Sequence, residues 1–298
     1  MLFSIIIRTL NEEKYLQELL TSINSQIVDS NENTEIILVD SGSTDKTIEI
    51  ATTNSVKIIK ISKDEFSFGR SLNIGCQNAK GEILIFISGH CIPTDKKWLK
   101  NLVKPIQEKV ASYTYGFQTG RDNTAFSEYQ IFEKFFPDKE VNDLNLSFFC
   151  NNANAALNKN IWEQFKFDET ITGLEDMKLA KILQENKKNI KYVRNAKVFH
   201  IHNENFKQIK NRYEREALAL KKILPEIKVS FSDFCKFLFL GISKDFAKAL
   251  KKKVLMKNLI SIIRFRFFMN LGIYFGNKKQ SISSKIDKKK YFFPNEEV

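Results

Sequence analysis

Residues 35–47, EIILVDSGSTDKT, contain a β-branched apolar run that stops at Asp40, a short turn, and the start of a helix expected over Lys46–Thr53. Residues 4–13, SIIIRTLNEE, have the same order: an apolar strand (Leu2–Ile7), polar residues at its end, and then apolar side chains at helical spacing. Because strand, turn and helix repeat, the two stretches predict βαβ units and a parallel sheet.

More strands and helices of the same sheet follow along the chain. Strands are expected over 56–61, 83–87, 110–118 and 191–198, and helices over 71–79 and 175–184. The strands read as continuous apolar runs, which is typical of a mostly parallel sheet covered by helices on both faces. The fold class is therefore α/β, with a Rossmann-like central sheet. The stretch around Asn151–Asn154 has no regular pattern and is expected to be irregular.

Polar residues follow three of these strands. Thr9, Asn11 and Glu12 come after the first, Asp40 begins the turn after the second, and Ser88-Gly89-His90 follows the strand at 83–87. Ligands of parallel sheets bind beyond the carboxyl ends of the strands, so we expect these groups along one edge. Asn11 is also expected to be the N-cap of the first helix, with acidic residues in the first turn.

Charge divides the chain unequally. Residues 205–298 hold 22 of the 47 Lys and Arg and 8 of the 35 Asp and Glu. We therefore expect an α/β domain over 1–204 and a basic, amphipathic helical region over 205–298. The most apolar part of that region, Asn258–Phe275, carries Arg264 and Arg266 near its middle, each costing about 2.5–3.5 kcal/mol at a bilayer centre. A spanning helix is not expected there.

The cysteines and the N-terminal residues indicate in which cellular compartment the protein is expected. The four cysteines are far apart and form no CxxC pair, so the sequence predicts neither a disulfide framework nor a zinc site, which fits a reducing cytoplasm. Leu2–Ile7 lacks a basic flank and is interpreted as a strand rather than a signal peptide. No nucleic-acid module accompanies the basic charge, so no nucleic-acid partner is expected.

Five motifs carry a resemblance to a known family: SIIIRTLNEE, EIILVDSGSTDKT, FGRSLNIGCQNAKGE, FISGHCIPTDKKWL and GLEDMKLA. In this order and spacing, over roughly residues 3–202, the chain resembles the family 2 glycosyltransferases of the GT-A fold. Within them it is similar to bacterial, rhamnosyltransferase-like members. The resemblance implies inverting transfer from a nucleotide-sugar donor to a glycan or lipid-linked acceptor, in capsule- or lipopolysaccharide-type biosynthesis. The location would be cytoplasmic, including the inner face of the cytoplasmic membrane.

The resemblance assigns donor-site roles to several residues. Thr9, Asn11, Glu12 and Asp40 would border the nucleoside, and Arg70 and Asn73 would face the diphosphate. Ser88 and His90 would also belong to the donor site. A carboxylate at Asp40 would accept charge-assisted hydrogen bonds from the nucleoside, and a guanidinium at Arg70 would pair with phosphate oxygens. Two alternatives stay open: Asp40 caps its own turn, and Arg70 is a solvated side chain.

The family's Asp-x-Asp metal motif is replaced here by Ser88-Gly89-His90. His200 and His202 stand where relatives place a metal- or phosphate-contacting histidine, and alternate strand residues share one face. One hypothesis is that His90, His200 and His202 bind a divalent ion, Mn²⁺ or Mg²⁺, of which Mn²⁺ accepts nitrogen ligands more readily. The alternatives are a metal-free site in which imidazolium and Arg stabilise the diphosphate, and purely structural histidines.

Asp176 is the predicted general base, and Glu175 beside it is expected to raise one carboxyl pKa by like-charge proximity. The alternative is an acidic pair that only suits a helix N-terminus.

The basic tail predicts peripheral contact with an anionic membrane. The alternative is that its helices pack on the α/β domain. A rival function is a degenerate family member that binds nucleotide-sugar or glycan without turnover. A NAD-dependent enzyme is disfavoured because no GxGxxG turn follows the first strand, and a nucleotidyltransferase because RTLNEE is not a Gly-rich, Lys-containing loop.

Overall fold

The computed structural model describes residues 1–139, 148–281 and 291–292. The chain folds into two compact units. The first unit comprises Met1–Arg121, Phe135–Thr170 and Glu175–Ile201, and the second Asp122–Lys134, Ile171–Leu174 and His202–Val298. The second unit thus combines its long segment from His202 with two short segments from earlier in the chain.

An eight-stranded sheet forms the centre of the first unit, in the order β3-β2-β1-β4-β7-β6-β8-β5. The strands are β1 (Leu2–Thr9), β2 (Asn33–Asp40), β3 (Lys57–Lys60), β4 (Ile83–Ser88), β5 (Cys91–Pro93), β6 (Tyr113–Thr119), β7 (Asn154–Asn158) and β8 (Ile190–His200). The pairs β3-β2, β2-β1, β1-β4 and β6-β8 are parallel. The strand β7 runs antiparallel to both β4 and β6, and β5 runs antiparallel to β8.

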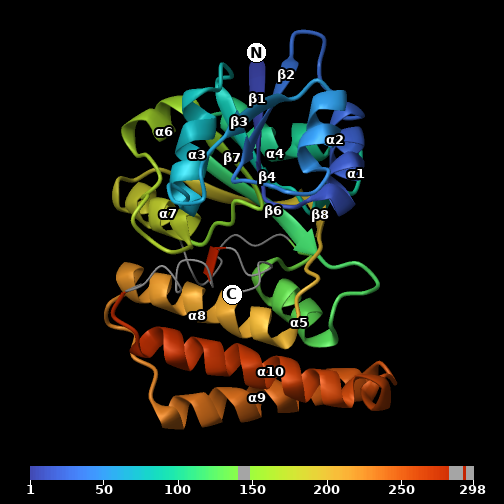
Figure 1. Ribbon diagram of the computed structural model, residues 1–298, viewed down its shortest axis with the longest axis vertical. Helices are drawn as coiled ribbons and strands as arrows, with labels where there is room; N and C mark the ends of the chain where they lie inside the picture. Colours follow the sequence, from blue (N-terminus) through green and yellow to red (C-terminus); the bar gives the residue numbers. More distant parts are fainter. Residues whose placement is uncertain (140–147, 282–290, 293–298) are drawn as a thin grey trace. The chain divides into compact units, whose positions relative to one another are not determined.

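Helices cover both faces of this sheet, as predicted for strands without polar alternation (Figure 1). They are α1 (Glu13–Asn24), α2 (Thr47–Thr53), α3 (Phe68–Gln77), α4 (Trp98–Gln107), α6 (Lys159–Gln164) and α7 (Glu175–Glu185). Phe3, Ile5 and Ile7 of β1 belong to the buried cluster that includes α1, α2 and α4. On the other face, Gly75 of α3 lies so close to Ile6 that an added Cβ would be 2.5 Å from its Cγ2.

The structure differs from the sequence-based predictions at two places. The stretch around Asn151–Asn154 is irregular up to Ala153, as expected, but β7, which begins at Asn154 and completes the sheet between β4 and β6, is not among the predicted strands. Asn11 is not an N-cap: α1 begins after Glu12 and has no side-chain cap bond. Asn11 instead has a positive φ of 56°, and its Oδ1 accepts a hydrogen bond from Thr44 N at 2.8 Å. The residue therefore joins the β1 and β2 loops rather than capping the helix.

The second unit is helical, as the sequence predicts for its C-terminal part. It contains α5 (Phe126–Phe135, which ends at the edge of the unit), α8 (Phe206–Ile223), α9 (Phe231–Lys251) and α10 (Leu255–Lys278). Capping boxes start α8 and α9, at Asn205 and Ser230. The helix α10 packs against α8 through Gly276, where an added Cβ would be 2.1 Å from Glu214 O. Among the described residues, α10 is the one helix long and apolar enough to cross a membrane by length and composition.

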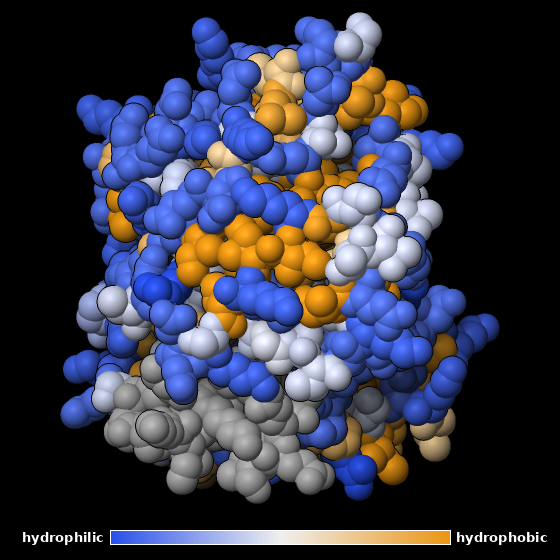
Figure 2. Space-filling model, turned by 45° about the horizontal axis from the view of Figure 1, so that its top comes forward, coloured by the Kyte–Doolittle hydropathy of each residue, from blue (hydrophilic) through white to orange (hydrophobic). Residues whose placement is uncertain are grey.

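The surface is mixed in character. Figure 2 shows one face on which hydrophilic side chains cover much of the area, with apolar side chains gathered between them. Most folded proteins expose some apolar area, so single exposed residues need no explanation. Apolar residues that share one face of a helix are more informative.

Asn154 explains why β7 lies where it does. Its side chain is fully buried; Oδ1 accepts from Trp98 Nε1 at 2.9 Å, and Nδ2 donates to Phe117 O at 3.1 Å and Ala196 O at 2.8 Å. Three polar groups would be left unpaired by Asn154→Ala. We expect this change to lower the free energy of unfolding by about 3 kcal/mol or more, measured by urea denaturation. Asn160→Ala, at an exposed position, is the control; an unchanged midpoint for Asn154→Ala would contradict the role of Asn154.

Candidate active site

The parallel strands bring the predicted polar groups of the first unit to one edge of the sheet. In the sheet register Thr9 of β1 pairs with Asp40 of β2, and Arg8 of β1 pairs with Ser88 of β4. The carboxyl ends of three strands therefore meet at one place. This is the edge at which ligands of parallel sheets bind.

Asp40 holds the turn that follows β2. It is 2% exposed, and its Oδ2 accepts from Gly42 N and Ser43 N, both at 3.0 Å. Oδ1 accepts from Thr9 Oγ1 at 3.3 Å and from the Ser43 hydroxyl. The turn-capping alternative for Asp40 is thus present in the structure, and Thr9 supports it.

A cavity of about 390 Å³ opens beside this turn. It is lined by Asp40, Gly42, Ser43, Ile48, Lys60, Ile61 and Ser62. Its volume lies within the usual range of ligand pockets, and it combines apolar walls with a few polar groups. Its polar groups are Asp40, Ser43, Lys60 and Ser62, and its apolar side chains are Ile48 and Ile61. Sequence reasoning missed Lys60, which was interpreted only as part of a strand.

Arg70 and Asn73 both lie on α3, but their surroundings differ. Arg70 is 43% exposed and lies 3.5 Å from Glu65 Oε1 and 3.4 Å from Glu169 Oε2. Asn73 is 2% exposed: its Nδ2 donates to Phe167 O and Glu169 Oε1, and its Oδ1 accepts from Trp162 Nε1 and Phe167 N. All four hydrogen-bonding positions of this amide are used inside the protein. These bonds tie α3 to the segment around Trp162 and Phe167, and the role of Asn73 at a diphosphate stays a prediction.

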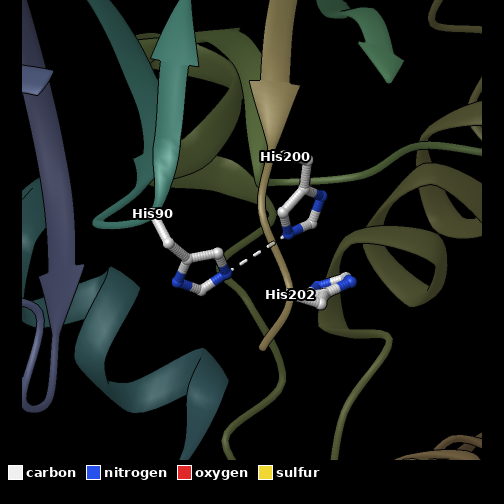
Figure 3. A group of neighbouring side chains, drawn as sticks. All are labelled: His90, His200 and His202. Atoms are coloured by element: carbon white, nitrogen blue, oxygen red, sulfur yellow. Dashed lines mark hydrogen bonds between the residues drawn. The ribbon is translucent and has the colours of Figure 1, made fainter. Parts of the chain in front are cut away.

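His90 and His200 face each other (Figure 3). Their Nε2 atoms are 3.3 Å apart, because Cys91 of β5 pairs with His200 of β8 and so places the preceding His90 beside it. His90 Nδ1 lies 2.7 Å from Glu12 Oε1, and His200 Nδ1 lies 2.7 Å from Gln118 Oε1. The sequence-predicted residues Glu12, His90 and His200 thus form one connected group.

The neighbours fix the tautomers of the two rings. A carboxylate oxygen accepts only, so His90 Nδ1 carries a proton when it binds Glu12. Asn151 Oδ1 accepts from Ala153 N, and Gln118 Nε2 donates to that same oxygen at 3.1 Å. Gln118 Oε1 therefore faces His200, whose Nδ1 must also carry a proton. Both Nε2 atoms then present lone pairs to each other.

Two lone pairs at 3.3 Å repel unless a positive charge lies between them. A shared proton supplies one such charge, and a divalent ion supplies another. In tetrahedral zinc sites, metal–nitrogen bonds of about 2.0–2.1 Å place two ligand nitrogens roughly 3.3–3.4 Å apart, which shows the size of spacing that one divalent ion can span. The spacing of His90 and His200 fits this value, and the hydrogen bonds at both Nδ1 atoms are the outer-shell partners that orient metal-binding imidazoles.

His202 belongs to the second unit. Its Nδ1 lies 2.8 Å from Glu128 Oε1, and Arg212 bonds both Glu128 Oε1 at 2.9 Å and Glu204 Oε2 at 2.7 Å. Burial raises the pKa of Glu128, but His202 and Arg212 outweigh it and lower that pKa to about 2. Glu128, His202 and Glu204 are close enough to hold a metal ion. The guanidinium of Arg212 already supplies the positive charge that these carboxylates need.

Asp176 begins α7 together with Glu175. It is 7% exposed, and its two oxygens accept from Asn152 N at 2.9 Å and Met177 N at 2.8 Å. Burial and the neighbouring Glu175 raise the pKa of Asp176 to about 7, against the opposing effects of these hydrogen bonds and of Arg8. A carboxyl with this pKa exchanges a proton near neutral pH, which suits a general base.

Arg8, at the end of β1, is a second residue that sequence reasoning missed. Its Nη1 lies 3.5 Å from Glu175 Oε1, and its guanidinium lies 4.9 Å from the centre of the Phe68 ring. Arg8 compensates part of the negative charge of the acidic pair. The available signal was the position of a lone cation at the end of a strand that is otherwise apolar.

Comparison with known proteins identifies the family. The model of the family described as "Glycosyl transferase family 2" matches residues 4–165. The chain belongs to this family. This family 2 chain is 28% identical to the O-antigen chain rhamnosyltransferase WbaN of Salmonella anatum over 196 residues, 62% of each chain. It is 36% identical to the poly(ribitol-phosphate) β-N-acetylglucosaminyltransferase TarS of Staphylococcus aureus over 91 residues, 29% of this chain and 16% of TarS.

Solved structures confirm the GT-A fold of this family 2 chain. The mannosyltransferase PcManGT of Pyrobaculum calidifontis superposes with a TM-score of 0.61 at 15% identity, over 99% of this chain and 88% of that one. At this identity the likeness concerns the fold. The aligned segments also span less than two thirds of TarS and of WbaN.

Removing the charge of Glu175 or that of Arg8 should shift the pKa of Asp176 in opposite directions. Glu175→Gln removes a like charge and should lower the Asp176 pKa, whereas Arg8→Met removes an opposite charge and should raise it. Both shifts are measured as the pH midpoint of the ¹³C carboxyl signal of labelled aspartate. Asp168 serves as the internal control: burial raises its pKa, but Lys178 and Thr170 outweigh burial and lower it. Shifts of the same sign in both variants would contradict the arrangement.

Proposed function

We propose that this chain is an inverting glycosyltransferase that moves a sugar from a nucleotide-sugar donor to a glycan or lipid-linked acceptor. The observation that carries the proposal is Asp176, a buried carboxyl with a pKa raised to about 7 in a chain of family 2. The proposal assigns each step to named side chains. Side chains at the strand ends would bind the donor, and Asp176 at the start of α7 would remove the proton from the acceptor.

The donor nucleoside would occupy the cavity beside the β2 turn. Asp40, Lys60 and Ser62 offer an acceptor, a cation and a hydroxyl at its wall, and Ile48 and Ile61 offer apolar area. Thr9 and Asn11 support the turn from the β1 side. Solved relatives of this fold support such a ligand, since TarS has been solved with UDP-GlcNAc and PcManGT with GDP-Man and Mn²⁺.

The diphosphate would lie toward Ser88 and His90. Arg70 would bind its oxygens after leaving its exposed ion pairs with Glu65 and Glu169. His90 and His200 would hold a divalent ion, Mn²⁺ in preference to Mg²⁺, through their Nε2 atoms. When bound, the ion would neutralise charge that develops on the leaving diphosphate. Glu12 and Gln118, at the two Nδ1 atoms, hold both rings with their Nε2 atoms aimed at the same point. His202 stays a predicted third ligand, although Glu128 binds its Nδ1.

Asp176 would take the proton from the acceptor hydroxyl as that oxygen attacks the anomeric carbon. Attack from the face opposite the leaving nucleotide inverts the anomeric configuration. Arg8 would limit the pKa of Asp176, and Glu175 would keep it from falling to the ordinary range of an aspartate. Asn152 N and Met177 N would fix the direction of the carboxylate lone pairs.

The biological setting is proposed from the relatives. WbaN of Salmonella anatum and RfbN of Salmonella typhimurium are both named O-antigen chain rhamnosyltransferase. We therefore place this chain in the assembly of a capsule- or lipopolysaccharide-type surface polysaccharide, in the cytoplasm or at the inner face of the membrane. The competing function is binding of nucleotide-sugar or glycan without turnover, which the absent Asp-x-Asp motif favours.

Asp176→Asn tests the enzymatic proposal. We expect transfer to fall by roughly 10²–10⁴-fold while nucleotide binding is kept, because the carboxylate is required only to accept the proton. Wild-type kcat/KM should rise as the pH increases through about 7, since Asp176 must lose its proton to act. The assay is donor consumption with a panel of nucleotide-sugars and acceptors.

Asp29→Asn, an exposed change between α1 and β2, is the matched control and should leave turnover intact. The thermal unfolding of each variant is measured beside its activity. Full activity of Asp176→Asn would remove this residue from the mechanism. Nucleotide binding without turnover in the wild type, with every donor tried, would favour the binding function.

Metal dependence is tested on the His90–His200 pair. Removal of divalent ions with EDTA should abolish transfer, and Mn²⁺ should restore it. His90→Ala and His200→Ala should each weaken Mn²⁺ binding at least tenfold, measured by electron paramagnetic resonance of the free ion, because each removes one of two nitrogen ligands. Undiminished transfer in EDTA would contradict the ion and favour imidazolium at the diphosphate.

A further inference from the structure

Exposed apolar side chains concentrate on two helices of the second unit. In the described part of the chain thirteen large apolar side chains are exposed, and ten of them belong to α9 and α10. Only Phe234, Asp245 and Ala249 of the 21 residues of α9 are buried. Among the described residues of the second unit, these two helices therefore leave an apolar surface uncovered.

The apolar residues of α10 form a stripe. Met256, Ile260, Ile263 and Phe267 follow the spacing i, i+4, i+7, i+11, which places them on one face of a helix. Their exposed fractions are 87%, 62%, 42% and 39%. A separate face of α10, with Phe265 1% exposed, packs on α8. The helix thus has one apolar face for the core and a second one directed to the surroundings.

The same helices are strongly basic. Residues 231–278 contain ten Lys and Arg against two Asp and no Glu. Both aspartates have structural partners: Asp245 forms two 2.7 Å hydrogen bonds with Arg266, and Asp233 binds Ser230 at the start of α9. Exposed lysines lie along both helices and the turn between them, at Lys236, Lys244, Lys251, Lys253 and Lys257.

Charge and apolarity together select the occupant of this surface. A second copy of the chain would bring an equally basic surface against this one, and like charges face to face oppose association. Nucleic acid would pair with the lysines but leave the apolar stripe in water. An anionic lipid surface satisfies both features, because lysine stems extend toward the headgroups while apolar side chains enter the acyl boundary.

We propose that α9 and α10 form a docking surface for an anionic lipid membrane. Met256, Ile260, Ile263 and Phe267 enter the boundary between headgroups and acyl chains, and the lysines bind the headgroups. The helix α10 lies along the membrane rather than across it, since the Arg266–Asp245 ion pair and the buried Asn270 and Asn277 hold it in the second unit. The inference rests on the proposed function only in that a lipid-linked acceptor would lie at the same membrane.

The test is binding of the full chain to vesicles, without donor or acceptor. Wild type should sediment with vesicles that contain phosphatidylglycerol and not with vesicles of phosphatidylcholine alone, and high salt should release it. Met256→Glu/Ile260→Glu should weaken binding at least tenfold. Lys251→Glu/Lys257→Glu should weaken it more than twentyfold, since each basic side chain near an anionic surface strengthens binding about fivefold.

Matched controls separate this surface from general effects. Ile27→Glu/Val110→Glu and Lys96→Glu/Lys166→Glu change exposed residues of the first unit and should bind vesicles as wild type does. All variants should unfold at the wild-type temperature. Three results would overturn the proposal: equal binding by the α10 variants, no binding by wild type, or binding that resists high salt. A dimer in analytical ultracentrifugation that Met256→Glu/Ile260→Glu dissociates would assign the surface to a second copy instead.

Because vesicle binding requires no turnover, the two proposals can fail separately. A wild type that binds vesicles but consumes no donor would contradict the proposed function alone. A wild type that transfers sugar to a soluble acceptor but ignores vesicles would contradict the docking surface alone.

Discussion

The parallel pairing of β1 with both β2 and β4 determines where the chemistry of the first unit can occur. Since all three strands point the same way, their polar ends meet at one edge, with Thr9 beside Asp40 and Arg8 beside Ser88. The middle of β1 and of β4, at Ile5–Ile7 and Ile83–Ile87, is buried and apolar, whereas polar side chains gather at the ends of these strands. The edge therefore collects Asp40, Glu12, His90 and Arg8 from segments far apart in the sequence.

The charges around Asp176 affect both the stability of the fold and the pKa of this carboxyl. A buried carboxyl such as Asp176 is unfavourable when ionised, and a second carboxyl beside it adds to that cost. Arg8 offsets part of it through Glu175. The result is a carboxyl whose pKa lies near 7 rather than near 4. The folded state therefore keeps a proton that the unfolded state has lost, and the free energy of unfolding falls as the pH rises from about 4 to about 7. Such a compromise is typical of sites that need a proton acceptor at neutral pH.

The sequence predicted the elements whose pattern is local. Apolar runs located β1, β2, β4, β6 and β8, and the motifs located Glu12, Asp40, His90, His200 and Asp176, although their functional roles stay predictions. What the sequence could not supply depends on tertiary contacts. The strand β7 is short and rich in Ala and Asn; it pairs with β4 and β6, and Asn154 at its start binds Trp98 and two backbone carbonyls. Asn73 matches a family motif, yet its amide is fully occupied by Trp162, Phe167 and Glu169. The exposed stripe on α10 required knowledge of which apolar face is buried.

The most direct test of a donor site at this edge is a crystal structure of the chain with a nucleoside diphosphate and Mn²⁺. We expect the base in the cavity between Asp40 and Lys60, the diphosphate beside Ser88, and the ion bound to the Nε2 atoms of His90 and His200. A nucleotide bound away from the ends of β1, β2 and β4 would contradict the central claim that this edge is the donor site.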